Sequence, residues 1–283
     1  MRKDGEMLER VVDPPTEAEI AAFRLEMLDY YSESGRSFPW RQTRDPWAIL
    51  VSEIMLQQTQ TDRVVPKYIA WLEAYPEPSE LVRAPLAEVL GLWSGLGYNR
   101  RALALVRAST RIVSLGRFPD DEDSLLEFPG VGPYTARAVL AFAFDRPVVL
   151  IETNIRSVFL HRFFAAEEGV ADSRIAPLVE ATLDRSDPRT WYYALMDYGV
   201  MLKRSLGNPN SRSAHYARQS PFADSHRRIR GSLLKELGSR GRADANELAS
   251  ALPFSRERVE KALGELKTEG FVAESCGIYR LGD

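Results

Sequence analysis

Two glutamates stand in settings where a carboxyl group could do acid–base chemistry. Glu53 is the only charged residue in the stretch 47–56, which is otherwise apolar apart from one serine. Burial among apolar side chains disfavours the ionised form of a carboxyl group, so the pKa of Glu53 is expected to rise and make it a proton donor near neutral pH. Glu152 follows four aliphatic residues and opens a predicted helix. There the helix dipole and the first backbone amides favour the ionised form.

Together, the two carboxyl groups indicate a type of reaction. Hydrolysis of a glycosidic bond needs an acid for the leaving group and an anion facing the oxocarbenium-like sugar. We therefore expect Glu53 and Glu152 to converge on one cleft. Taken singly, Glu53 could instead pair with a buried arginine as a structural group, and Glu152 could serve only to stabilise a helix start.

Residues 124–144 predict a short helix, a tight turn and a long apolar helix. The turn contains Gly130, Val131 and Gly132 between two prolines. Two glycines let the backbone turn sharply and leave its amides uncovered, and amides at a helix N-terminus suit a phosphate oxygen. Val131 is expected to plug into the core. A plain helix–helix turn is the alternative for such a string by itself.

The rest of the main body is also predicted to be helical. Thr16 with an acid three residues later forms a capping box that starts a first helix. Apolar stripes separated by glycine and proline then predict one helix after another between residues 45 and 160. They cover the ranges 86–90, 102–112, 124–128 and 134–144. No alternating strand pattern is found before residue 270, so the main body should be all-α.

The C-terminal part differs in pattern. Residues 206–224 are polar and rich in turn-forming residues, which indicates a linker. Beyond it, helices are predicted over 228–237, 245–252 and 255–269, the last capped by Ser255, followed by two short strands over 271–275 and 277–281. Three helices and a hairpin form a winged-helix-like pattern. Such a domain binds DNA or packs against protein, and the pattern leaves both open.

Composition narrows the class of protein. The chain has 283 residues, a net charge of -3 and a single cysteine, Cys276, which excludes an internal disulfide and a cysteine-built metal or iron–sulfur site. No apolar run reaches the length of a membrane span, and the charged N-terminus is no signal peptide. A cytoplasmic, nucleoid-associated protein is expected. The basic residues gather between 203 and 230, where Asp224 is the only acid, which predicts a basic surface.

Six segments occur in the order and spacing of a known family. They are FPWR, SEIMLQQTQ, LWSGLGY, FPGVGPYTA, IETN and ALMDYGVML, between about residues 38 and 222. Through them the chain resembles the helix-hairpin-helix base-excision glycosylases, which include endonuclease III and the MutY-type adenine glycosylases. The resemblance implies an all-α, two-lobed fold with the small winged-helix-like (α+β) domain added. The predicted parts are a flexible N-terminus (1–15), a discontinuous lobe (16–44 and 151–222), a helical bundle (45–150) and the C-terminal domain (225–283).

The resemblance also assigns roles to residues. It implies a monofunctional DNA N-glycosylase in which Glu53 protonates the base and Glu152, with Tyr134 and Asn154 nearby, stabilises the sugar cation. Endonuclease III has its Schiff-base lysine at the position of Tyr134, which cannot form an imine, so no lyase activity is expected. The other implied site residues are Arg41 and Asp197 near the base pocket, Gln58 and Tyr98 as wedges in the base stack, and Gly130, Val131, Gly132, Thr135, Lys203 and Arg204 as further DNA contacts.

Three departures from the family bear on specificity. Glu152 stands where the family has aspartate, and its extra methylene moves the carboxyl group by about 1 Å. The four cluster cysteines align with Lys203, Ser211, Ala214 and Ser220, so a clusterless member without a cofactor is expected, which leaves open a monovalent cation at the hairpin. The family's C-terminal domain for 8-oxoguanine is replaced by the winged-helix-like one.

The expected partner is double-stranded DNA with a mismatch or lesion, bound by a monomer. Adenine opposite guanine or 8-oxoguanine is the first target predicted. The alternatives are a mispaired thymine or uracil, another damaged base, or a non-catalytic protein that binds DNA lesions.

Overall fold

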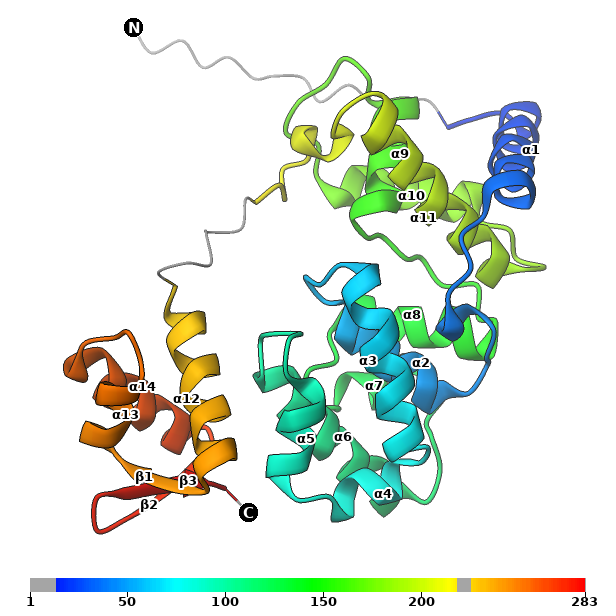
Figure 1. Cartoon of the computed structure of the whole chain (residues 1–283). Helices are drawn as coiled ribbons and strands as arrows, with labels where there is room; N and C mark the ends of the chain where they lie inside the picture. Colours follow the sequence, from blue (N-terminus) through cyan, green and yellow to red (C-terminus); the bar gives the residue numbers. More distant parts are fainter. Residues whose placement is uncertain (1–13, 218–224, 283) are drawn as a thin grey trace, which may run out of the picture. The chain divides into compact units, whose positions relative to one another are not determined.

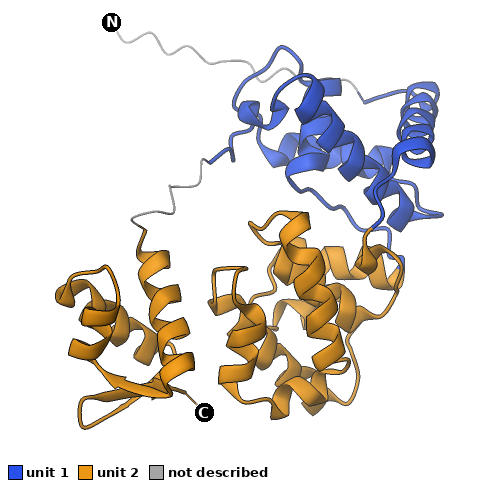
Figure 2. Ribbon diagram, viewed as in Figure 1, with its two compact units in different colours: residues 1–37, 145–217 blue, residues 38–144, 218–283 orange. Residues whose placement is uncertain are grey.

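The computed structural model describes residues 14–217 and 225–282, so the predicted flexible N-terminus (but for its last two residues) and Ser220 lie outside the described residues. The chain divides into two compact units, coloured blue and orange in Figure 2: unit 1 holds residues 1–37 and 145–217, and unit 2 holds 38–144 and 218–283. The changeovers fall a few residues before the predicted boundaries at 44 and 150. Within the described part, no helix is long and apolar enough to cross a membrane.

Unit 1 is helical (Figure 1). Its elements are α1 (Glu17–Ser34), α9 (Thr153–Phe163), α10 (Asp172–Thr182), α11 (Pro188–Ser205) and the 3-10 helix η2 (Pro209–Arg212). The predicted capping box is confirmed, since the Thr16 side chain accepts from the Glu19 amide and the Glu19 side chain accepts from the Thr16 amide. Phe23 of α1 packs edge-on against Phe159 of α9 and Trp191 of α11, with ring centroids 5.7 Å apart in both pairs. These aromatic contacts join α1, α9 and α11 into one core.

Unit 2 contains the predicted hairpin and the C-terminal domain. Its elements before the linker are η1 (Pro39–Arg41), α2 (Pro46–Leu56), α3 (Thr61–Ala74), α4 (Pro78–Arg83), α5 (Leu86–Trp93), α6 (Arg100–Leu115), α7 (Glu122–Leu126) and α8 (Pro133–Phe144). Trp71 and Trp93 are fully buried and meet edge-on at 5.4 Å. Their contact ties α3 to α5.

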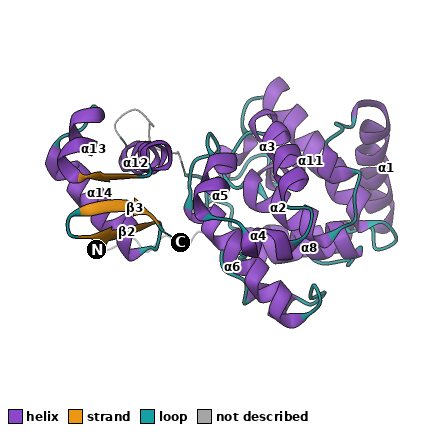
Figure 3. Ribbon diagram, turned by 60° about the horizontal axis from the view of Figure 1, so that its bottom comes forward, coloured by secondary structure: helices purple, strands orange, loops and turns teal. Residues whose placement is uncertain are grey.

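The C-terminal domain has the predicted winged-helix-like order with one strand more. Its elements are α12 (His226–Arg240), β1 (Arg242–Asp244), α13 (Ala245–Ala251), α14 (Arg256–Thr268), β2 (Val272–Ser275) and β3 (Ile278–Leu281). The strands form an antiparallel sheet in the order β1-β3-β2, which α12 and α14 contact (Figure 3). The prediction of no strand before residue 270 is wrong: β1 is too short to show alternation. Ser255 is the N-cap of α14, but its side chain makes no capping hydrogen bond.

An ion-pair cluster centred on Glu269 joins the C-terminal domain to α6. Helix α12 contacts α5, and the Glu269 carboxylate accepts from Arg100 of α6 at 2.6 and 2.7 Å and from Arg230 of α12 at 2.6 and 2.8 Å. The hydrogen bond from Arg100 is the largest cause that lowers the pKa of Glu269 to about 2; burial opposes the shift and Arg230 adds to it. The C-terminal domain is thus fastened beside the start of α6.

This cluster predicts an acid-sensitive contribution to stability. Because the pKa of Glu269 is lowered from 4.5 on folding, its contribution is present above pH 4.5 and is lost as the pH falls toward 2. We expect Glu269→Gln to lower the free energy of unfolding by about 1.5 kcal/mol at pH 7, near the low end for charged hydrogen bonds since Arg100 is mostly exposed. Chemical denaturation at pH 7 and pH 3 measures the difference in the free energy of unfolding between wild type and variant. A difference between wild type and variant that stays constant with pH would contradict this account; Glu260→Gln, in an exposed pair, is the control.

Candidate active site

Helix α2 carries Glu53 inside unit 2. Asp45 caps this helix by accepting from the Trp47 amide at 3.1 Å and the Ala48 amide at 3.3 Å. The helix packs against α8 with most of its side chains buried, so Glu53 is only 6% exposed. The hydroxyl group of Tyr134, in the first turn of α8, donates to Glu53 Oε2 at 3.1 Å. The structure therefore brings two of the predicted catalytic residues into direct contact.

The hairpin between α7 and α8 has the geometry that its sequence predicts. Val131 is buried at 7% exposure, whereas Gly130 and Gly132 on either side are exposed. Gly130 has φ +80°, and a Cβ there would lie 2.6 Å from the Cβ of Ala104, so only glycine fits without a shift. The loop thus presents backbone between the two helices, as a phosphate contact requires.

Gln57 connects the hairpin to the end of α2. Its side-chain amide donates to the Gly130 carbonyl oxygen and to the Thr135 hydroxyl, both at 3.3 Å. Sequence reasoning passed over Gln57 in favour of its neighbour Gln58. The Thr135 side chain is buried, so the DNA contact predicted for Thr135 would have to use its backbone.

Both predicted wedge residues have a left-handed backbone conformation. Gln58 has φ +54° and Tyr98 has φ +47°, and such left-handed conformations are uncommon outside glycine and often occur at functional sites. Gln58 is exposed at the end of α2 and Tyr98 is half-buried just before α6. The guanidinium of Arg227, from the C-terminal domain, lies 5.2 Å from the Tyr98 ring centroid and also donates to its hydroxyl group.

A buried arginine that sequence reasoning missed holds both wedge loops. Arg101 is 8% exposed, and its guanidinium lies between the loop after α2 and the loop before α6. It donates to the carbonyl oxygens of Ile54 (2.9 Å), Met55 (3.0 Å), Gln57 (2.6 Å), Leu96 (3.1 Å) and Gly97 (3.0 Å), and to the Thr59 hydroxyl (3.1 Å). Burial lowers the pKa of Arg101 to about 10, so it stays charged at neutral pH. The sequence offered one signal for this role: Arg101 is a charged residue directly before the apolar stripe of α6.

Glu152 is the N-cap residue of α9 in unit 1, as predicted. Its Oε1 accepts from the backbone amides of Asn154 at 2.7 Å and Ile155 at 2.9 Å, and its Oε2 accepts from the Asn154 side chain at 3.2 Å. Burial raises the pKa of Glu152, and the amides and Lys203 oppose the shift without cancelling it. The two amides lower the pKa of Glu152, as the sequence predicts, but burial, which the local sequence does not show, outweighs them.

The loop after α11 does not fit an iron–sulfur cluster. Cys276 is the chain's single cysteine and lies exposed in the turn between β2 and β3, and the aligned positions carry lysine, serine and alanine. Hydrogen bonds hold this loop instead. Arg212 donates to the carbonyl oxygens of Leu160 at 3.1 Å and Ala165 at 2.5 Å, and Val170 forms a backbone bridge with Ser213.

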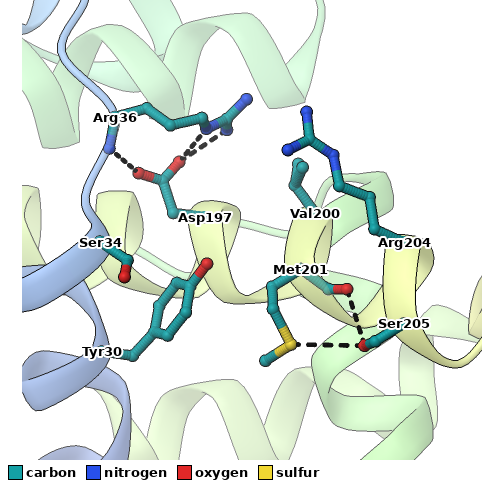
Figure 4. Close-up of a pocket in the computed structure, with 8 residues that line it drawn as sticks. All are labelled: Tyr30, Ser34, Arg36, Asp197, Val200, Met201, Arg204 and Ser205. Atoms are coloured by element: carbon teal, nitrogen blue, oxygen red, sulfur yellow. Dashed lines mark hydrogen bonds and ion pairs between the residues drawn. The ribbon is translucent and has the colours of Figure 1, made fainter.

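Asp197 lies at a pocket of unit 1. It is 2% exposed and accepts from the backbone amide of Arg36 at 2.7 Å and from its guanidinium at 2.6 and 2.8 Å. The pocket, of about 310 Å³, is lined by Tyr30, Ser34, Arg36, Asp197, Val200, Met201, Arg204 and Ser205 (Figure 4). Arg204, a predicted DNA contact, is exposed at its rim.

The remaining predicted site residues divide between the units. Arg41 belongs to η1 of unit 2, where its guanidinium lies 5.2 Å from the Phe38 ring centroid, whereas Asp197 belongs to unit 1. In the same way, Glu53 belongs to unit 2 and Glu152 to unit 1. The base pocket of Arg41 and Asp197 and the shared cleft of the two glutamates therefore stay predictions.

The hairpin, the buried acid and the helical body place the protein among the helix-hairpin-helix repair proteins. Residues 51–192 match the model of the HhH-GPD superfamily of base excision DNA repair proteins, and the chain belongs to that superfamily. The adenine DNA glycosylase of Mycolicibacterium smegmatis is 36% identical over 276 residues, which cover 89% of this chain and 93% of that protein. The predictions of the family and of a DNA glycosylase are confirmed by these matches.

Other relatives agree with this assignment. The adenine DNA glycosylase of Mycobacterium tuberculosis is 44% identical over 135 residues, 47% of this chain and 44% of that protein. Among solved structures, a thermostable thymine-DNA glycosylase superposes with a TM-score of 0.59 at 24% identity, over 67% of this chain and 90% of that one. A trapped endonuclease III–DNA covalent intermediate superposes with a TM-score of 0.52 at 22% identity, over 73% of this chain and 91% of that one. At these identities the structures support the predicted fold class and no more.

Proposed function

We propose that this protein removes adenine from mismatched DNA by hydrolysing its N-glycosidic bond. The observation that carries the proposal is the contact between Glu53 and Tyr134, in which a tyrosine hydroxyl from the first turn after the hairpin meets a buried carboxyl group. The named adenine glycosylases among its relatives support adenine as the base.

The residues divide the reaction between them. Glu53 donates a proton to the leaving adenine as the bond from the base to the sugar C1′ breaks. A water then adds its hydroxide to C1′, and its remaining proton returns to the Glu53 carboxylate. Glu152 faces the sugar cation with an orientation fixed by three hydrogen bonds. The hairpin backbone grips phosphate, while Gln58 and Tyr98 fill the gap that the flipped base leaves.

A panel of duplexes tests both the activity and the base. Each carries one labelled strand with adenine opposite guanine or 8-oxoguanine, thymine or uracil opposite guanine, or a damaged base. Wild-type protein is expected to release adenine and leave the strand uncut until alkali cleaves the abasic site, since Tyr134 cannot form an imine. Release of thymine or uracil instead of adenine would contradict adenine as the excised base. Strand cleavage before alkali would contradict the absence of lyase activity.

A second candidate is a non-catalytic protein that binds lesions. Glu152 in place of the family's aspartate favours it, because the extra methylene changes where the carboxylate sits, by about 1 Å. This candidate predicts binding to abasic or mismatched duplex without turnover of any substrate in the panel. The intact contact between Glu53 and Tyr134 favours the enzyme.

A further inference from the structure

One face of helix α11 packs closely against the first turn of α9. A Cβ at Gly199 would lie 2.3 Å from the carbonyl oxygen of Asn154, so only a glycine permits this approach. Lys203 is four residues further along α11 and therefore lies on the same face. Its ammonium group donates to Asn154 Oδ1 at 2.8 Å. Lys203 is thus built into the α9–α11 contact.

The contact continues from Asn154 to Glu152. The Asn154 side chain accepts from Lys203 through its oxygen and donates through its nitrogen to Glu152 Oε2 at 3.2 Å. An amide held at its oxygen by a charged donor has its nitrogen aimed in one direction. Lys203 therefore holds the Asn154 side-chain nitrogen in the direction of Glu152 Oε2.

The charges in this cluster depend on one another. Burial is the main cause that lowers the pKa of Lys203, and Glu152 opposes it. Burial likewise raises the pKa of Glu152, and the positive charges of Lys203 and Arg156 oppose that shift. The Arg156 guanidinium is held by Asp172 through bonds of 2.6 and 2.7 Å, which offsets its charge. That leaves Lys203 as the counter-charge of Glu152 with no acidic ion-pair partner of its own among the described contacts.

We propose that Lys203 is a positioning residue for the catalytic carboxylate of Glu152. It orients Glu152 through Asn154 and keeps a compensating positive charge beside it, so that the longer glutamate side chain is held ionised as the base leaves. The inference rests on the proposed function, in which Glu152 faces the sugar. Lys203 aligns with a cluster cysteine of the family. The proposal gives it a role inside the protein in place of the predicted DNA contact.

The first test measures Glu152 directly and needs no turnover. In the full-length protein, carbon-detected NMR of glutamate carboxyl groups follows the Glu152 titration, assigned by its loss in Glu152→Gln. We expect Lys203→Met to move the titration to higher pH, because an opposing positive charge is removed. Lys203→Arg should stay near the wild type. Arg185→Met removes an exposed cation of the same unit and should leave Glu152 unchanged. An unmoved titration in Lys203→Met would overturn the proposal.

The second test measures base release in single turnovers between pH 5 and 9 on adenine:8-oxoguanine duplex. Lys203→Met is expected to slow release by roughly tenfold or more, to shift the acidic limb of the rate profile upward and to leave duplex affinity unchanged. Loss of affinity with an unshifted limb would show a phosphate contact and sink the positioning role. If wild type releases no base from any duplex, the proposed function fails, while the NMR titration still decides the role of Lys203.

Discussion

Replacing Glu53 with glutamine is expected to abolish adenine release while duplex binding persists. Glutamine keeps the shape of the side chain and can still accept the hydrogen bond of Tyr134, but it has no proton to give the leaving base. General acid catalysis contributes roughly 10²- to 10⁴-fold to such reactions, so the single-turnover rate should fall by at least the lower figure. Quenched-flow measurement of abasic sites, alongside a duplex-binding titration, gives both quantities.

The matched control for this variant is Glu127→Gln. Glu127 precedes the hairpin and forms an exposed ion pair with Arg111, so its loss should alter neither the rate nor the fold. Equal thermal unfolding of the two variants would show that Glu53→Gln is folded. If Glu53→Gln releases base as fast as wild type, Glu53 is not the acid and the site must be sought elsewhere.

Replacing Arg101 with methionine is expected to damage stability and DNA engagement together. The change leaves five carbonyl oxygens, three of them in buried hydrogen bonds, without this donor, and a buried acceptor left unsatisfied costs about 1–3 kcal/mol. Denaturant unfolding measures that loss. In the fraction that stays folded, Gln58 and Tyr98 lose the support of their loops.

The effect of Arg101→Met on DNA engagement is measured by base flipping. A 2-aminopurine placed opposite or beside the target base becomes fluorescent when it unstacks, and the variant should show a weaker signal at saturating protein. Arg117→Met, which removes an exposed arginine after α6, is the control. A variant as stable as wild type, with an unchanged flipping signal, would show that Arg101 supports neither loop.

Local signals carried much of the fold. The capping box at Thr16, the N-cap at Glu152 and the hairpin around Val131 each depend on neighbours within a few residues, and the structure has all three where the sequence puts them. The acid in α2 was visible for the same reason, as one charge in an apolar run. The strand β1 was not, because its three residues are too few to show alternation and its partner β3 lies more than thirty residues away in sequence.

The contacts that escaped prediction join residues far apart in sequence. Arg101 bonds to carbonyl oxygens 44 to 47 residues earlier, and Lys203 bonds to a residue 49 positions away. Backbone carbonyls have no sequence signature, so the local sequence shows Arg101 as a charge beside an apolar stripe but not which carbonyl oxygens it bonds. The burial of Glu152, which raises its pKa, also escaped prediction, because the local sequence shows a helix start and not what packs over it.

Because two loops depend on Arg101, substitutions in one loop are coupled to substitutions in the other. Gln57 and Gly97, forty residues apart, share the donors of one side chain, so a substitution that shifts either loop alters the hydrogen bonds of the other. Their energies should therefore be non-additive in double-mutant cycles. Selection or engineering for a new lesion would have to vary both segments at once, and a library randomised at only one of them would return few active clones.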